Sequence, residues 1–177
     1  MSEKSQLILM SEYNRLMNQR IFEAAGKLSK ATLTEDKGAF FKSIITTLNH
    51  IMIGDILWLT RFEKHPSNFS SLKQMSDFPQ PQTLDKILFD DISTFLEQRR
   101  KLDTIIHQFC HELTEEDINS ALTYTNFMKE NHSKRFGYLV LHVFLHQIHH
   151  RGQVTTLLSQ ESLDFGETDL PEIVPEL

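Results

Sequence analysis

Cysteine, glycine and proline are scarce in this chain of 177 residues. The single cysteine, Cys110, excludes a disulfide within the chain. Six glycines and five prolines are about half of average usage, and no proline falls between residues 82 and 170. Sandwiches and barrels use both residue types in their many turns, so this scarcity argues against an all-β chain.

Long apolar runs and basic stripes are also missing. The apolar run near the N-terminus covers only residues 7–10, which is too short for a signal peptide or a membrane span. The formal net charge is -6, and no basic stripe is present to neutralise phosphates. We therefore expect no nucleic-acid partner, no membrane partner and a cytoplasmic location.

Helical periodicity dominates what is present. Apolar residues recur at three- and four-residue steps in four long segments, at about residues 6–28, 37–63, 84–111 and 133–160. Four helices of similar length in a chain of this size predict an all-α fold, a four-helix bundle. No domain boundary is visible, so residues 1–177 are expected to form a single domain.

Two connections between these segments are long. Residues 65–83 include three prolines, and a connection of this length is typical of a crossover that lets neighbouring helices run parallel. The apolar side chains of Phe69 and Phe78 predict that the crossover packs onto the bundle. Within the second connection, residues 114–132, the stretch 121–127 alternates weakly, which allows a short hairpin before the last helix.

Histidine is abundant and clustered, with nine in the chain. Two histidines four residues apart on a helix lie on one face, where both imidazoles can bind the same metal ion. Three pairs have this spacing: His142/His146, His146/His150 and His107/His111.

Of these pairs, His146 and His150 have the helical position that most favours a metal site. The two side chains share their face with Leu139, Val143 and Leu157, so they are expected to point into the apolar interior. Burying imidazoles in a core costs free energy unless they are paired or bound to metal.

His50, in the second segment, is the third ligand that this geometry favours. It shares a helical face with small residues such as Thr47 and Gly54, whereas bulkier ones such as Phe41 are expected on the opposite side. Small neighbours leave room for a cleft beside the imidazole. The residues alone leave two interpretations open, a three-histidine site or unrelated histidines.

His107 and His111 have a simpler interpretation. Both lie near the end of the third segment, where a histidine interacts favourably with the helix dipole and the last carbonyls. We expect neither to bind metal. Cys110, beside an apolar stripe, is expected to be a buried structural thiol.

Residues 141–153, LHVFLHQIHHRGQ, resemble the C-terminal signature of the DinB/YfiT-like superfamily: a histidine, three residues, then His-Arg-Gly-Gln. Residues 47–50 followed by Asp55 and Trp58 resemble the family's second-helix pattern. Residues 13–18 and 168–171 are similar to its first helix and its end.

The resemblance implies a four-helix bundle that holds a divalent metal ion on three histidines. Transferred by motif position, the ligands are His50, His146 and His150, the same three that the helical faces favour. Similar proteins are often homodimers. Those with known activities use a low-molecular-weight thiol, as S-transferases or thiol-dependent isomerases.

This ligand set predicts a particular chemistry. Three neutral imidazoles leave the ion its full charge and an open position, as in catalytic zinc sites. Such a site can bind a thiolate, which predicts a metal-dependent transferase that joins a small thiol to a small electrophile. Zn, Ni and Fe, or Cu, suit imidazole ligands. A hydrolase that uses metal-bound hydroxide, and a non-catalytic metal- or ligand-binding module, remain alternatives.

Several neighbouring residues receive supporting roles. We expect a structural contact from Arg151, close helix approach at Gly152 and a hydrogen bond from Gln153 to a ligand or water. Trp58 is expected in the core. A wall of the substrate pocket is expected from the long crossover, with Phe69 or Phe78 against the acceptor.

The far side of the last helix is apolar as well, which fits either an internal position or a homodimer. This side comprises Leu141, Phe144, Leu145 and Ile148.

Overall fold

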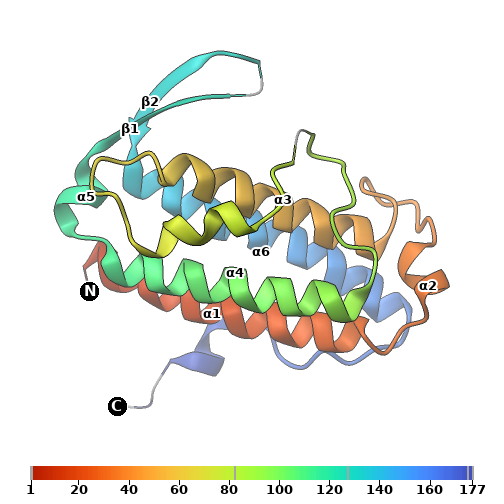
Figure 1. Cartoon of the computed structure of the whole chain (residues 1–177). Coiled ribbons are helices and arrows are strands. Elements are labelled where there is room, and N and C mark those ends of the chain that lie inside the picture. Colours follow the sequence, from red (N-terminus) through yellow and green to blue (C-terminus); the bar gives the residue numbers. More distant parts are fainter. Residues whose placement is uncertain (1, 82, 127, 175, 177) are drawn as a thin grey trace.

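The computed structural model describes residues 2–81, 83–126, 128–174 and 176. The chain is mostly helical, as the periodicity predicted, with one two-stranded sheet among these residues. Figure 1 shows the four long helices side by side: α1 (Glu3–Ala25), α3 (Ile44–Phe62), α4 (Ile92–Glu112) and α6 (Phe136–Gln160). The short elements are α2 (Lys30–Thr34), η1 (Ser71–Asp77), α5 (Glu115–Asn119), β1 (Ala121–Thr125), β2 (Asn131–Arg135) and η2 (Leu170–Ile173).

The long helices run in two directions. Helix α1 packs against α4 and α6, and α3 packs against α6. Helices α1 and α6 run one way and α3 and α4 the other, so the chain between α3 and α4 returns along the length of the helices (Figure 1). This is the crossover that the long connection predicted. None of the described helices is both long enough and apolar enough to cross a membrane.

Two helices begin later than the periodicity predicts. Helix α3 begins at Ile44, where Ser43 and Thr46 form a reciprocal capping box. Gly38 and Lys42 before it have φ values of 71° and 67°, which a continuing α-helix does not accommodate. Residues 38–43 therefore form a turn instead of the first turns of a helix.

Helix α4 begins at Ile92, with Asp91 as its N-cap, and not near residue 84. The reason is Asn49 of α3. Its Oδ1 accepts hydrogen bonds from the backbone N–H groups of Leu88 and Phe89, at 2.7 and 3.0 Å, and its Nδ2 donates to the Phe89 carbonyl. These bonds satisfy the backbone of residues 88–89 outside a helix.

The crossover packs against the helices as predicted. Its 3₁₀ helix η1 contacts α3 and α4, and Leu72 and Met75 are buried. Phe69 and Phe78 are buried in the same hydrophobic core. Cys110 is also fully buried there, and burial raises the pKa of its thiol to about 12, so it is a structural residue as expected.

The two strands form an antiparallel hairpin that pairs Ala121 with Arg135 and Thr125 with Asn131. The hairpin allowed by residues 121–127 is therefore present, apart from residue 127, which lies outside the described residues. It begins after α5, leads into α6 and arches past α3 (Figure 1).

A charged network lies at the centre of the long helices. Arg99 of α4 donates to Asp55 of α3 at 2.5 Å and lies 2.7 Å from Asp103, and all three side chains are fully buried. Asn18 of α1 donates to Asp103 and to Gln147 of α6, both at 3.0 Å. Burial raises the pKa of Asp55 to about 6, and the charge of Arg99 opposes that rise.

Arg151 extends this network on α6. Its guanidinium donates to the side-chain oxygens of Asn14, Asn18 and Gln147. Two buried arginines and two buried aspartates thus balance in charge, and the polar groups of all four long helices are joined.

We expect Arg99→Ala to lower the free energy of unfolding by ~3–5 kcal/mol, because it leaves two buried carboxylates without their cation. Urea denaturation followed by circular dichroism measures this change. Arg100→Ala is the matched control, since Arg100 is half exposed in its ion pair with Glu23 and should cost at most ~1 kcal/mol. Equal losses for the two variants would show that the network is not a structural centre.

Candidate metal centre

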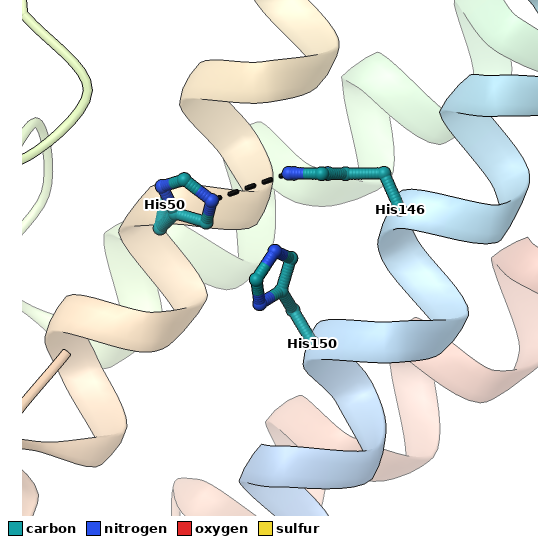
Figure 2. A group of neighbouring side chains, drawn as sticks. All are labelled: His50, His146 and His150. Atoms are coloured by element: carbon teal, nitrogen blue, oxygen red, sulfur yellow. Dashed lines mark hydrogen bonds between the residues drawn. The ribbon is translucent and has the colours of Figure 1, made fainter. Parts of the chain in front are cut away.

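Three histidines converge between α3 and α6. His50 comes from α3, and His146 and His150 come from successive turns of α6 (Figure 2). One ring nitrogen from each lies within 4.8 Å of the others, and the Nε2 atoms of His50 and His146 are 3.2 Å apart. The structure thus brings together the three residues that the sequence singled out, and no other described residues form a group of this kind.

Two of the imidazoles are oriented by hydrogen bonds at their Nδ1 atoms. His50 Nδ1 lies 3.2 Å from the Leu84 carbonyl, and His150 Nδ1 lies 2.9 Å from the side-chain oxygen of Gln153. Each oxygen accepts only, so each Nδ1 carries the proton in a neutral ring and Nε2 keeps its lone pair. The hydrogen bond expected at Gln153 is present, with the side chain of Gln153 accepting from the candidate ligand His150.

Phe41 and Gly54 fix the rings by packing. Phe41 stacks on His50 with ring centroids 4.0 Å apart and meets His150 edge-on at 5.3 Å. The expectation that Phe41 faces away from His50 is wrong, because residues 38–43 form a turn that carries it over the site. Gly54 allows α3 and α6 to approach, since a Cβ there would lie 2.7 Å from Cε1 of His146.

All three imidazoles favour the neutral form. Burial, followed by the neighbouring His150 and His50, lowers the pKa of His146 from 6.5 to about 3. Burial also lowers the pKa of His50 and of His150. Neutral imidazoles are the form that binds metal.

The cluster fits a divalent ion. Two nitrogens that each lie ~2.0–2.1 Å from a tetrahedral zinc ion stand ~3.3 Å apart. The 3.2 Å between the Nε2 atoms of His50 and His146 agrees with this spacing. Zn, Ni, Fe and Cu accept imidazole donors.

A cavity of about 300 Å³ opens beside His50 and His146. The hairpin, α3 and α6 form its walls, with a contribution from Leu84 of the crossover. Phe69 and Phe78 do not line it, so the expectation that they contact an acceptor here is wrong. The described residues of its lining are His50, Gly54, Leu57, Trp58, Arg61, Leu84, Tyr124, Asn126, His132, Lys134, His142 and His146.

The pair His107 and His111 forms no three-residue group of metal-type ligands with any other described residue, although a carboxylate oxygen of Glu12 lies 3.9 Å from His107 Nδ1. Their rings are 4.7 Å apart, and His107 Nδ1 lies 2.9 Å from the hydroxyl of Ser11 on α1. This contact gives His107 a structural partner.

Comparison with known proteins agrees with the signature on α6. The sequence profile of the DinB family matches residues 1–172. The chain belongs to the DinB family. Protein DinB of Bacillus subtilis (strain 168) is 25% identical over 158 residues, which cover 89% of this chain and 87% of that relative. No solved structure matches the sequence significantly.

The predictions for the remaining residues of the DinB signature have different outcomes. Arg151 makes the structural contact with α1 that was expected. Gly152 does not mark a close helix approach, because a Cβ there would have no neighbour within 4 Å. Trp58 is only partly buried: it packs against the edge of the hydrophobic core and lines the cavity, where the rings of Tyr124 of the hairpin and His142 of α6 each lie 5.2 Å from its ring.

We expect His146 of the metal-free protein to stay neutral from about pH 7.5 to about pH 5, because burial and two neighbouring imidazoles disfavour its charged form. Its ring resonances in NMR spectra, assigned with His146→Asn, measure this. Unfolding restores a pKa near 6.5, so the unfolded chain takes up more protons below that pH and the free energy of unfolding falls as the pH falls. A titration midpoint near 6.5 in the folded protein would contradict the described burial.

Proposed function

We propose that this DinB-family protein is a metal-dependent enzyme that transfers a low-molecular-weight thiol to a small electrophile. Residues 1–177 then form one four-helix-bundle domain, in which His50, His146 and His150 hold a divalent ion such as Zn, Ni or Fe. The observation that carries the proposal is the convergence of three neutral imidazoles beside a cavity of about 300 Å³.

The chemistry of the ligand set supports an open site. Three protein ligands leave a divalent ion able to stabilise a thiolate at a further position. The hydrogen bonds from His50 to Leu84 and from His150 to Gln153 keep the Nε2 lone pairs aimed at one point. Phe41 covers one side of the cluster, where it stacks on His50 and meets His150 edge-on.

The reaction that we propose is a substitution. The thiol loses its proton to solvent, and the sulfur lone pair forms a bond to the electrophilic carbon. The leaving group departs from that carbon with the electron pair of its bond. The aromatic walls formed by Trp58 and Tyr124 hold the apolar part of the acceptor beside the histidines.

Hydrolysis and simple binding are the competing functions. None of the described residues that line the cavity is a carboxylate of the kind that serves as general base in zinc peptidases, although the lining histidines His132 and His142 leave a hydrolase another base. A binding module would use the same three histidines without turnover. The cavity next to the cluster supports an enzyme over such a module, because it gives a second substrate a place to bind.

We further propose a homodimer in the cytoplasm. Tyr138, Leu141, Leu145 and Ile148 leave an exposed apolar face along α6, which supports a second copy as partner. Phe144 does not belong to this face, because it is buried. The single, buried cysteine suits a reducing compartment.

We expect one zinc ion per chain in the wild-type protein and none in His146→Ala, because two imidazoles do not replace the three-ligand set. Isothermal titration calorimetry with zinc and metal analysis of untagged protein measure the stoichiometry. His107→Ala is the matched control and should retain one ion. Loss of metal in His107→Ala with retention in His146→Ala would identify the other histidine pair as the site.

A pair of glycine variants tests the same site through its packing. Gly54→Ala should weaken zinc binding at least about tenfold, because its Cβ displaces the ring of His146. Gly152→Ala, on a helix surface with open space, should leave the affinity unchanged. Equal affinities for both variants would contradict the described approach of α3 and α6.

We expect protein loaded with Zn, Ni or Fe to accelerate the reaction of small thiols with 1-chloro-2,4-dinitrobenzene above the rate with the free ion. His150→Ala should lose this acceleration, because it removes one of the three imidazoles. Product absorbance measures the rate. If no metal gives acceleration while zinc still binds, the protein is a binding module; hydrolysis of esters without thiol transfer would identify a hydrolase.

A further inference from the structure

Helix α3 contacts the crossover through two adjacent residues, Asn49 and His50. Asn49 is only 1% exposed, and its side-chain amide binds the backbone of Leu88 and Phe89. His50 contacts the same part of the crossover at the Leu84 carbonyl, which lies 3.2 Å from its Nδ1. Two neighbouring positions of one helix thus bind the crossover, one through a buried amide and the next through a candidate metal ligand.

The amide of Asn49 uses all of its hydrogen-bonding groups. Its Oδ1 accepts from the backbone N–H groups of Leu88 and Phe89, at 2.7 and 3.0 Å. Its Nδ2 donates to the Phe89 carbonyl and to the Ile45 carbonyl one turn earlier in α3, both at 2.8 Å. A neutral amide offers two donors and two acceptor positions, so this buried side chain is fully satisfied by the arrangement. Asn49 therefore ties residues 88–89 to α3.

Few other contacts hold this part of the crossover in place. Residues 83–91 contain no helix or strand, and residues 83–87 are exposed. Within the described parts of the chain, no backbone–backbone hydrogen bond involves residues 83–90. The ring of Phe89 packs against Phe95 with centroids 5.3 Å apart, a contact that leaves the backbone groups unpaired. The hydrogen bonds to α3 are thus the directional contacts of this backbone.

The Leu84 carbonyl decides which nitrogen of His50 faces the other two histidines. A carbonyl only accepts, so it keeps the proton on Nδ1 and leaves the Nε2 lone pair toward His146, whose Nε2 lies 3.2 Å away (Figure 2). Without that acceptor a neutral imidazole populates both protonated forms, and only the form with a bare Nε2 is ready to bind metal there. Residue 84 is four residues from residue 88, so the bonds to Asn49 restrict where this carbonyl lies.

We infer that Asn49 is a positioning residue for the candidate metal centre: by holding residues 88–89 it keeps the Leu84 carbonyl on His50 and so orients that imidazole for metal binding. The inference rests on the proposed metal site. Asn49 is not among the described residues that line the cavity, so it acts through His50 alone. Hydrogen bonds that orient a ligating histidine contribute ~10–100-fold to metal affinity or activity.

The first test needs no metal. Nitrogen NMR of the metal-free wild-type protein, at a pH above the usual imidazole pKa, distinguishes the two protonated forms of His50, with His50→Asn for assignment. We expect the proton on Nδ1, together with slow hydrogen exchange of the backbone N–H groups of Leu88 and Phe89, because Asn49 binds both. A proton on Nε2 of His50, or fast exchange of both N–H groups, would overturn the inference.

Asn49→Ser breaks the link to the crossover with little change to α3. Serine lacks the amide that reaches residues 88–89, while its hydroxyl still has the Ile45 carbonyl as an acceptor. We expect the proton of His50 to be shared between Nδ1 and Nε2, and the zinc affinity in isothermal titration calorimetry to fall about tenfold. Wild-type zinc affinity in this variant would contradict a positioning role.

Two further variants separate positioning from a loss of stability. Asn49→Asp keeps acceptors for both N–H groups, so it should retain the proton on Nδ1 of His50 and most of the zinc affinity. Leu48→Ala removes buried apolar packing one residue earlier, so it should lower the urea midpoint at least as much as Asn49→Ser and leave the zinc affinity unchanged. If either variant weakens zinc binding as much as Asn49→Ser does, the positioning role is refuted.

The proposed function and this inference fail in different ways. If the wild-type protein binds no zinc, yet the His50 proton lies on Nδ1 and becomes shared in Asn49→Ser, the metal site is refuted and the orientation of His50 by Asn49 stands. If zinc binds and the His50 proton does not respond to Asn49→Ser, the metal site stands and the inference is overturned.

Discussion

The ion pair between Arg99 and Asp55 is the constraint on which the rest of the structure depends. Buried charges are tolerated only when they are paired, so α3 and α4 must keep the rotation that places these groups 2.5 Å apart. Gln147 and Arg151 impose the same requirement on α6 through Asn14 and Asn18 of α1. A helix that rotated or shifted by one residue would leave a buried charge without its partner. The polar centre therefore specifies the arrangement that the surrounding apolar side chains fill.

Each residue of the candidate metal centre on α6, and Gly54 on α3, is the sequence neighbour of a residue in the charged network. Asp55 is preceded by Gly54, the residue over which His146 packs. Gln147 follows His146, and Arg151 follows His150. On a helix, adjacent residues are separated by about 100°, so the inner face of α6 holds the network while the next face presents the imidazoles. The network and the histidine cluster thus share the same helix rotations, and an error in one displaces the other.

Local patterns in the sequence predicted the helices and the histidines, and long-range contacts decided what the patterns missed. The spacing of His146 and His150 and the small residues around His50 favoured these three histidines as ligands but left unrelated histidines open, and the resemblance of residues 141–153 to a family signature decided between the two. The starts of α3 and α4 were not predicted, because Lys42 takes a positive φ and because Asn49 accepts hydrogen bonds from backbone N–H groups 39 and 40 residues away. The prediction that Phe69 or Phe78 lines the substrate pocket was wrong for the same reason, because long-range contacts decide which segments form the cavity wall. Which face of a hairpin meets a helix depends on its register, and weak alternation over a few residues does not determine the partner surface.

The sequence distance between the candidate ligands has a thermodynamic consequence. His50 and His146 are 96 residues apart, so the cluster exists only when the chain is folded. A divalent ion bound there would join α3 to α6 as a reversible cross-link in a chain whose one cysteine forms no disulfide. By mass action, free metal at a hundred times its dissociation constant adds ~2.7 kcal/mol to the free energy of unfolding. The lifetime of the folded protein would then follow the supply of metal ions in its surroundings.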